Sequence, residues 1–319
     1  MIGIDVGGTK IAACLVDPQG RITSSIRRST DVTSPDATLD SIASTAKELI
    51  AMNNIDHHRI DAIGFGIPGL VDAEKGIGIA SVNLKWENIP VRAGLEARLG
   101  VRCVIDNDVR AGAMGEAYFG AAKGLRNMVY LNIGTGISAV ILLDGKFFMG
   151  VNGLAGEIGH AVLVPDGPLC KCGGRGCLEA VASGPAIAAR ALEKIRSGRD
   201  SVLSNQLTDS SLPLTAEKVF EAAALGDQVA NETLAEVGTL MAYSLQYLAL
   251  AYDPDVIVIG GGVVQGGSPL IIRIQEKLQQ LANDSWVFRK VYTKDLVKLS
   301  SLGSDAGVFG AAALVAPQI

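Results

Sequence analysis

The sequence predicts a two-domain α/β protein, and three observations support this fold class. A chain of 319 residues exceeds the usual size of one hydrophobic core, so two domains are expected. Hydrophobic residues make up 48% and charged residues 19%, with 38 glycines, which is typical of a well-packed α/β protein with many tight turns. A pattern of strand, glycine turn and strand occurs near residue 8 and again near residue 135, as expected for two related domains.

In the first half of the chain, apolar and β-branched runs alternate with turns. We expect strands at residues 2–6, 11–16, 22–28, 61–67 and 101–105, and helices at 36–52, 91–99 and 109–120. Residues 76–90 mix strand and loop patterns. The strand at 101–105 leads into Asp106, Asn107 and Asp108 directly before a helix, where α/β proteins commonly place their chemistry.

In the second half, the strand at 128–133 runs into Gly134, Thr135 and Gly136, and a second strand follows to residue 143. Further strands are expected at 256–259 and 297–300, and helices at 184–196, 215–225, 227–251, from 269, and at 303–314. The polar stretch 197–213 is predicted to be a connection on the surface.

Charge and hydropathy exclude two classes of partner. The net charge is −5, and the chain has no Lys/Arg-rich run, so nucleic-acid binding is not expected. There is no signal-peptide pattern and no uncharged apolar run long enough to span a membrane, so we expect a cytoplasmic protein without membrane contact. Cys14 and Cys103 lie in apolar strand-like runs, as expected for buried thiols in a reducing compartment.

Four potential soft metal ligands lie close together in the chain. Cys170, Cys172 and Cys177 have the spacing C-x-C-x4-C, and His160 precedes them by ten residues. Three thiolates and one imidazole suit a tetrahedral zinc site. A disulfide would leave one of the three cysteines unpaired, and three unconnected reduced thiols in a glycine-rich turn are the other alternative.

The predicted zinc site has a structural role, because four protein ligands leave no position for a catalytic water. A zinc hydrolase is therefore disfavoured. The metal would instead hold the loop that carries Glu157 and Glu179 at its two ends.

Three glycine-rich turns, each directly after a strand, indicate phosphate binding, because backbone N–H groups approach an anion closely where Cβ atoms are missing. Each turn alone is more often a plain hairpin, and none matches the Walker pattern or G-x-G-x-x-G. Their occurrence together favours phosphate binding. We expect them to be separate from the metal loop, because they follow other strands.

The order of these motifs resembles the ROK family of bacterial sugar kinases and sugar-responsive repressors. The shared motifs, along the whole chain, are D-x-G-G-T-K, I-G-T-G, E-x-G-H, C-x-C-G-G-x-G-C-L-E and I-G-G-G. This resemblance implies a two-domain actin-like, hexokinase-like (ribonuclease H-like) ATPase fold in which ATP and sugar meet in an interdomain cleft. We expect a small domain of residues 1–117 plus 303–319 and a large domain of 118–302 that carries the zinc loop.

The resemblance also implies roles for individual residues. Asp5 would lie near Mg²⁺, and Asp108 would be the catalytic base, although the adjacent Asp106 could play that part or cap the helix. Ser138 departs from the family pattern, which continues with glycine. The implied ATP contacts are Gly7, Gly8, Thr9, Lys10, Gly134, Thr135, Gly136, Gly260, Gly261 and Gly262. The implied sugar contacts are Gly69, Asn83, Asn107, Asp108, Glu157, His160 and Glu179.

The base is expected to be a carboxylate rather than a histidine. His57 and His58 lie in a polar segment and are expected on the surface, whereas His160 would be committed to zinc. The second ring nitrogen of a zinc-bound His160 would keep its proton and could donate a hydrogen bond to a sugar hydroxyl.

The resemblance therefore implies an ATP-dependent hexokinase of glucokinase type that needs Mg²⁺ and forms homodimers or homotetramers. Asn83 with Leu84 and Trp86 resembles the N-L-x-W segment of the family's glucokinases and favours glucose. A kinase for N-acetylmannosamine or N-acetylglucosamine is the alternative, because these sugars differ from glucose at C2. The other alternative is a sugar-sensing repressor-type protein without its DNA-binding domain, since the family's repressors carry an N-terminal winged helix and here the first strand starts at residue 2.

Overall fold

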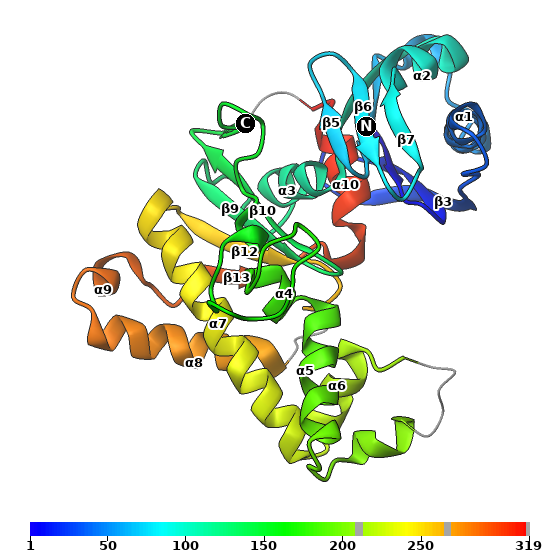
Figure 1. Cartoon of the computed structure of the whole chain (residues 1–319). Coiled ribbons are helices and arrows are strands. Elements are labelled where there is room, and N and C mark those ends of the chain that lie inside the picture. Colours follow the sequence, from blue (N-terminus) through cyan, green and yellow to red (C-terminus); the bar gives the residue numbers. More distant parts are fainter. Residues whose placement is uncertain (208–212, 265–268, 317–319) are drawn as a thin grey trace. The chain divides into compact units, whose positions relative to one another are not determined.

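A computed structural model describes residues 1–207, 213–264 and 269–316 of the chain. These residues divide into unit 1, comprising residues 1–124 and 300–319, and unit 2, comprising 125–299 (Figure 1). The sequence-based boundaries lie nearby, after residue 117 and after residue 302. Both units are α/β structures, as predicted, and each is described by itself.

Unit 1 is built on a five-stranded mixed sheet with the order β3-β2-β1-β4-β8. Its strands are β1 (Ile2–Val6), β2 (Lys10–Val16), β3 (Ile22–Ser29), β4 (Ala62–Ile67) and β8 (Arg102–Asn107). The first glycine turn joins β1 to β2 as an antiparallel hairpin, whereas β1, β4 and β8 are parallel. All five strands were predicted from their apolar and β-branched runs.

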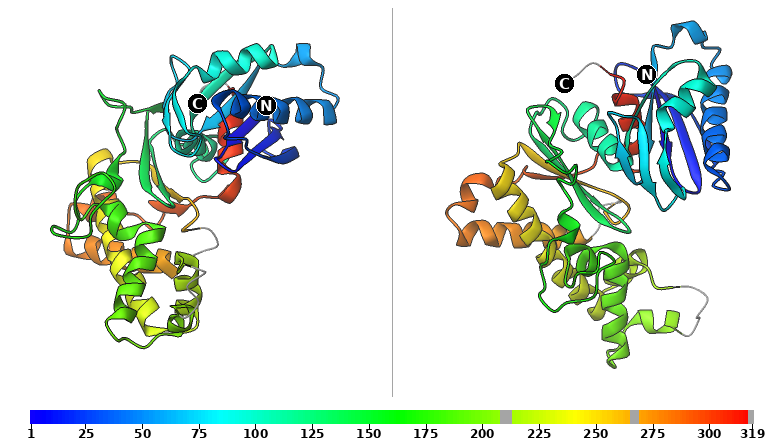
Figure 2. Two further views of the ribbon diagram at one scale, coloured as in Figure 1. Left: turned by 45° about the vertical axis from the view of Figure 1, so that its right-hand side comes forward. Right: turned by 45° about the horizontal axis from the view of Figure 1, so that its top comes forward.

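Helices cover both faces of this sheet (Figure 2). One face packs against α1 (Pro35–Met52) and α2 (Val91–Leu99), and the other against α3 (Asp108–Tyr118) and α10 (Ala306–Ala313). Glycine lets α10 approach closely, because a Cβ at Gly64 would lie 1.8 Å from the carbonyl oxygen of Ala311. The strands of unit 1 are therefore mostly buried on both sides.

A second, three-stranded antiparallel sheet of unit 1 occupies the segment where the sequence mixed strand and loop patterns. It has the order β5-β6-β7, with β5 at Leu70–Asp72, β6 at Ile77–Ser81 and β7 at Trp86–Ile89. Leu84 and Trp86 are buried in the core beneath it. The short 3₁₀ helix η1 (His57–Arg59) precedes β4.

The carboxylate of Glu116 on α3 is fully buried. It contacts both the segment where the chain leaves unit 1, near residue 124, and the segment where the chain re-enters it, near residue 300. It accepts hydrogen bonds from the Ala121 N–H at 2.8 Å, the Leu302 N–H at 3.1 Å and the Ser300 hydroxyl at 2.5 Å. Several donors converge on one carboxylate, as a buried charge requires. The 3₁₀ helix η4 (Gly303–Asp305) then leads into α10.

Unit 2 contains a five-stranded sheet with the order β11-β10-β9-β12-β13. Its strands are β9 (Met128–Ile133), β10 (Ile137–Leu143), β11 (Lys146–Phe147), β12 (Val256–Gly260) and β13 (Val297–Leu299). Its helices are η2 (Ile158–His160), α4 (Leu178–Ala182), α5 (Gly184–Arg196), η3 (Val202–Leu207), α6 (Ala216–Ala224), α7 (Gln228–Tyr252), α8 (Pro269–Asp284) and α9 (Phe288–Val291). Alternate residues of β9 pack with these helices in one hydrophobic core.

The differences from the predicted elements concern short segments. The sequence missed β11, α4 and α9, because two to five residues are too few to show a period. The predicted surface connection 197–213 contains η3, in which Leu203 is buried, and residues 208–212 lie outside the described part of the chain. No helix among the described residues is both long and apolar enough to cross a membrane.

Candidate functional site

The parallel strands of unit 1 bring two carboxylates together at one edge of the sheet. Asp5 of β1 pairs with Gly66 of β4, and Gly66 pairs with Asp106 of β8. A Cβ at Gly66 would lie 3.5 Å from both the Asp5 Oδ1 and the Cα of Asp108. Asp5 and Asp108 therefore both lie close to Gly66 of the middle strand.

Asp108 is the first residue of α3, and its carboxylate is fixed by local hydrogen bonds. Its Oδ1 accepts from the Val109 N–H at 2.9 Å and from the Asn107 Nδ2 at 2.8 Å. Burial nevertheless raises the pKa of Asp108 from 3.8 to about 6. A carboxylate with this pKa is ionised at neutral pH and is a stronger base than an exposed aspartate.

Asn107 organises the surroundings of Asp108. Its side-chain oxygen caps α3 by accepting from the Val109 and Arg110 N–H groups, while its Nδ2 also donates to the Gly69 carbonyl at 2.8 Å. Gly69 has φ +102°, and a Cβ there would lie 2.2 Å from the carbonyl oxygen of Ala80. Three predicted sugar residues, Gly69, Asn107 and Asp108, are thus joined in one hydrogen-bonded chain.

The structure separates the two aspartates that the sequence left ambiguous. Asp106 is buried and forms an ion pair with Arg110, with 2.5 Å between the guanidinium and Oδ1. Among the ion pairs of residues 1–207, 213–264 and 269–316, none involves Asp108. Asp106 therefore has its charge balanced within the protein, whereas Asp108 has no ion pair among the described residues.

Asp5 also has a raised pKa, about 6, because it is buried and because Asp108 repels its charge, with Lys10 opposing the shift. The start of α10 leaves space for it, since a Cβ at Gly307 would lie 2.6 Å from the Asp5 Cγ. Two neighbouring carboxylates that repel each other are a favourable place for a divalent cation with oxygen ligands, such as Mg²⁺.

The first glycine turn contacts the loop of Asn83. A Cβ at Gly8 would lie 2.8 Å from the Asn83 carbonyl oxygen. The Thr30 hydroxyl donates to the Gly7 carbonyl at 2.6 Å, which fixes the turn from the end of β3. Asn83 itself is exposed, as are Thr9 and Lys10.

The residues that flank Asn83 have a packing role. Leu84 and Trp86 are 1% and 3% exposed, so they anchor the loop in the core of unit 1 and cannot contact a ligand on its surface. The predicted surface position of His57 and His58 is confirmed, because both are exposed, with the Nε2 of His57 2.7 Å from the Leu99 carbonyl oxygen.

In unit 2 the four predicted metal ligands lie together. The ligand atoms of His160, Cys170, Cys172 and Cys177 are all within 4.8 Å of one another. The His160 Nδ1 is 3.7 Å from the Cys170 Sγ, and the Cys172 Sγ is 3.7 Å from the Cys177 Sγ. A tetrahedron with metal–sulfur bonds of about 2.3 Å has edges of roughly 3.8 Å, so the cluster fits a zinc ion.

These distances rule out a disulfide within the cluster. A sulfur–sulfur separation of 3.7 Å is far longer than a disulfide, and all five cysteines are free. The loop has little regular secondary structure, with isolated bridges from Val162 to Cys177 and from Leu169 to Arg175 and backbone hydrogen bonds within its turns. Four protein ligands close the coordination sphere, which gives zinc the structural role predicted for it.

Two of the predicted sugar contacts of unit 2, Glu157 and His160, lie at the metal cluster. His160 turns its Nδ1 toward Cys170, and its Nε2 lies 3.8 Å from the Glu157 Oε2. The Nε2 and this carboxylate are partly exposed and close enough to bind one hydroxyl group together. If Nδ1 bound a metal, Nε2 would carry the ring proton and could donate a hydrogen bond to that hydroxyl.

Glu179 lies at the other end of the metal loop and contacts the second glycine turn. Its Oε2 accepts from the Ile137 N–H at 3.1 Å, and a Cβ at Gly136 would lie 2.6 Å from the same oxygen. The expectation that the metal loop and the glycine turns are separate was therefore wrong. A contact between residues 42 positions apart left no local signal in the sequence.

A pocket of about 790 Å³ in unit 2 joins the second and third glycine turns, and its volume suits a nucleotide-sized ligand. It is lined by Gly134, Thr135, Gly184, Pro185, Ala188, Leu214, Thr215, Ala216, Glu217, Phe220, Gly262 and Val263. The sequence analysis identified the glycine turns but missed the residues from α5 and from the start of α6. Their composition carries no motif, and only the fold brings them together.

The glycines of these two turns fall into two groups. Gly136, Gly260 and Gly261 lie against neighbouring residues, since a Cβ there would be 2.6 Å or less from the Glu179 carboxylate, the Tyr130 side chain or the Ile133 backbone, respectively. A Cβ at Gly134 or Gly262 would meet nothing within 4 Å. These last two glycines face open space in the pocket, as expected where the backbone approaches a ligand.

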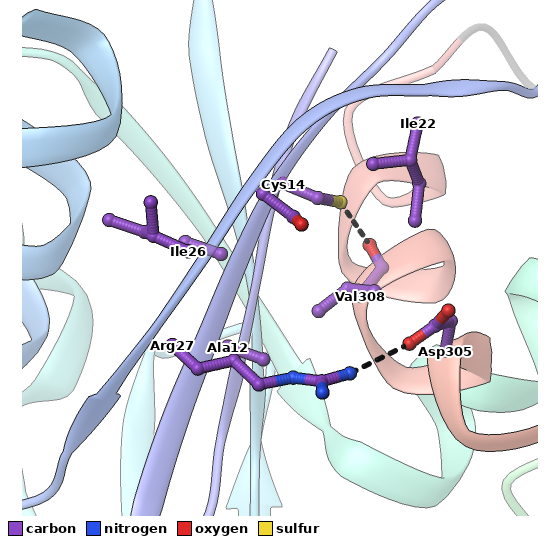
Figure 3. Close-up of a pocket in the computed structure, with 9 residues that line it drawn as sticks. Ala12, Cys14, Ile22, Ile26, Arg27, Asp305 and Val308 are labelled. Atoms are coloured by element: carbon purple, nitrogen blue, oxygen red, sulfur yellow. Dashed lines mark hydrogen bonds and ion pairs between the residues drawn. The ribbon is translucent and has the colours of Figure 1, made fainter. Parts of the chain in front are cut away.

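A smaller pocket of about 190 Å³ in unit 1 is lined by β2, β3 and α10 (Figure 3). The Cys14 thiol lies in it, 3.7 Å from the Val308 carbonyl oxygen, and burial raises its pKa to about 12. Arg27 and Asp305 form an exposed ion pair beside it. Cys14 is thus an inert core thiol, and Cys103 is likewise buried, as predicted.

Known proteins are similar to this chain in sequence and in fold. The family model described as "ROK family" matches residues 1–318. Glucokinase of Halalkalibacterium halodurans is 33% identical over 99% of this chain and 95% of its own length. The structure of a ROK family glucokinase from Streptomyces griseus in complex with glucose and AMPPNP matches with a TM-score of 0.77 and 32% identity, covering 98% of both chains. The xylose repressor of Caldicellulosiruptor bescii is 31% identical over 79% of this chain but only 62% of its own length.

The metal cluster leads to a direct prediction. Cys172→Ser should lower the zinc content from about one ion per chain and expose the loop 157–179 to proteolysis, because a serine hydroxyl is a poor zinc ligand. Elemental analysis and limited proteolysis measure these two effects. Cys103→Ser is the matched control, since Cys103 lies outside the cluster and its substitution should leave zinc unchanged. Full zinc content in Cys172→Ser would contradict the assignment.

Proposed function

The chain belongs to the ROK family and is an ATP-dependent hexokinase, and on this premise we propose that it phosphorylates the 6-hydroxyl of glucose. The observation that carries the proposal is the state of Asp108. It is a partly buried carboxylate without an ion pair, its pKa is about 6, and it lies beside Asp5 at the ends of parallel strands. These are the properties expected of a general base next to a metal-binding carboxylate.

In the proposed reaction, Asp108 removes the proton of the sugar hydroxyl while the hydroxyl oxygen attacks the γ-phosphorus of ATP. The bond from that phosphorus to the bridging oxygen breaks, and ADP leaves. Asp5 would help to hold Mg²⁺, which neutralises charge on the phosphates when bound. Gly134 and Gly262 would admit the nucleotide to the 790 Å³ pocket of unit 2.

We assign hexose contacts to residues of both units. In unit 1 these are Gly69, Asn83, Asn107 and Asp108, and in unit 2 they are Glu157, His160 and Glu179. The backbone oxygen of Gly69 already accepts from Asn107, so its part in sugar binding is indirect. Thr9, Lys10 and the backbone of Gly7 and Gly8 would bind phosphate oxygens.

A panel of hexoses tests the function and its alternatives. We expect coupled ADP release to be fastest with glucose, because it lacks the bulky C2 substituent of N-acetylmannosamine and N-acetylglucosamine. A strong preference for an N-acetylated sugar would instead support the kinase alternative. If no sugar were phosphorylated although sugar bound, the sensor alternative would be favoured, for which the similarity to xylose repressors is the motivating observation.

Asp108→Asn should lower kcat more than about a thousandfold and leave glucose affinity nearly unchanged, because the amide keeps the shape but accepts no proton. Steady-state kinetics and calorimetry measure the two effects. Asp106→Asn is the control: its carboxylate is used by Arg110, so it should lower thermal stability and leave turnover measurable. The reverse result would assign the base to Asp106.

The same base predicts the pH dependence. Because Asp108 must be ionised and its pKa is about 6, kcat/KM should fall about tenfold per pH unit below pH 6 and be flat just above it. A profile that stays flat down to about pH 4.5 would exclude a base with this pKa.

We also propose that the chain forms a homodimer or homotetramer through an apolar patch on unit 2. The patch consists of the exposed residues Phe148, Met149, Val151, Leu154, Tyr247 and Leu250. Its two segments lie close together, since the rings of Phe148 and Tyr252 are 6.3 Å apart. A contiguous patch of this kind is rarely left in water and suits a self-complementary contact with a second copy.

Light scattering after size exclusion tests this contact. The double variant Val151→Asp with Leu250→Asp should have a smaller mass than wild type, and that of one 33.1 kDa chain if wild type is a dimer, because two charges per copy would be buried in the interface. Trp286→Asp is the control, since Trp286 is 74% exposed and lies outside the patch. An unchanged mass in the double variant would place the interface elsewhere.

A further inference from the structure

The carboxylate of Glu179 links the metal loop to the second glycine turn. Cys177, a predicted zinc ligand, is the residue before α4, and Glu179 lies in the first turn of that helix. The Glu179 Oε2 accepts from the Ile137 N–H at 3.1 Å and fills the space in which a Cβ of Gly136 would lie. The turn therefore contacts a residue of the helix that begins directly after the predicted zinc ligand Cys177.

Other contacts from the same part of the chain hold the turn 134–136. The Gly184 N–H, at the start of α5, donates to the Gly134 carbonyl at 2.9 Å. On the other side, Gly159 of the segment before the cysteines packs on Ile137, because a Cβ there would lie 2.0 Å from the Ile137 carbonyl oxygen. Residues from both ends of the metal loop thus enclose one glycine turn.

We propose that Glu179 is a positioning residue for the nucleotide as well as a contact for the hexose, so that the metal loop couples the two affinities. The inference rests on the proposed function for its assignment of nucleotide to the 790 Å³ pocket, which Gly134 and Thr135 line. The Glu179 Oε2 holds the turn by accepting a hydrogen bond from the Ile137 N–H. The other carboxylate oxygen, Oε1, would bind a sugar hydroxyl. Any ligand that shifts Glu179 then shifts the turn, and the coupling works equally in both directions.

Two substitutions at this position separate the roles. Glu179→Ala removes the acceptor of the Ile137 N–H, and the loss of a hydrogen bond to a charged group corresponds to about tenfold or more in an equilibrium constant. Glu179→Gln keeps a carbonyl oxygen for the Ile137 N–H but loses the charge. The alanine variant should therefore weaken nucleotide binding about tenfold, whereas the glutamine variant should stay within about threefold of wild type.

The test is calorimetry of Mg²⁺–AMPPNP binding without sugar, followed by glucose binding without nucleotide. Glu157→Ala is the matched control, because Glu157 is the other sugar-side carboxylate and lies beside His160 rather than against the turn 134–136. It should lose glucose affinity and keep nucleotide affinity, whereas Glu179→Ala should lose both. Wild-type nucleotide affinity in Glu179→Ala would overturn the proposal.

Two further measurements keep the test decisive. Zinc content and thermal unfolding show whether Glu179→Ala is folded; if it is not, hydrogen exchange of the Ile137 amide is compared between wild type and Glu179→Gln. Strong protection in wild type that is largely kept in the glutamine variant would support the contact, because the amide oxygen still accepts from Ile137, and rapid exchange in wild type would refute it. Failure of wild type itself to bind Mg²⁺–AMPPNP would refute the proposed function instead, independently of Glu179.

Discussion

The tetrahedron of His160, Cys170, Cys172 and Cys177 is the constraint on which the functional half of unit 2 depends. The segment between Glu157 and Glu179 has little regular secondary structure: a short 3₁₀ helix, two isolated bridges and backbone hydrogen bonds within its turns. Metal ligation would add a strong constraint to these contacts, because it joins residues 160 and 177 at a distance of a few ångströms. Glu157 and Glu179, the carboxylates proposed to contact the sugar, lie at the two ends of this segment, and Glu179 contacts a glycine turn.

Unit 1 positions its carboxylates differently, because parallel strands bring Asp5 and Asp108 close together at their carboxyl ends. This arrangement has a cost in folding stability. Asp5 and Asp108 have pKa values of about 6 in the folded protein, against 3.8 for an exposed aspartate. Folding therefore favours their protonated forms more than the unfolded chain does. Their contribution to stability is present below about pH 4 and is lost as the pH rises through 6. A bound divalent cation would offset this cost at neutral pH.

The parts of the structure with a local signature could be predicted from the sequence. Strands such as β1 and β9 are continuous apolar runs, and the metal ligands combine a rare residue type with a characteristic spacing. The pairing of Asp106 with Arg110 was not accessible in this way, because Asp106 lies at the end of β8 and Arg110 in the first turn of α3, so no helical spacing relates them.

The remaining features depend on contacts between distant residues. Nothing near Glu179 indicates that it bonds to Ile137, and nothing in the start of α6 indicates that Glu217 and Phe220 line a pocket with Gly134. Glycine illustrates the limit most clearly, because Gly134 and Gly136 look equivalent in the sequence. One faces open space and the other accommodates a carboxylate, a difference that only the three-dimensional neighbours define.

A crystal structure of the zinc-loaded protein with glucose and AMPPNP, with anomalous data at the zinc edge, would test the central claim most directly. The account predicts one zinc ion on the four ligands, glucose hydroxyls bonded to Glu157 and Glu179, and the sugar 6-hydroxyl within hydrogen-bonding distance of Asp108. It also predicts that Glu179 still accepts from the Ile137 N–H. Glucose bound away from Asp108, or no anomalous peak among the three cysteines, would contradict it.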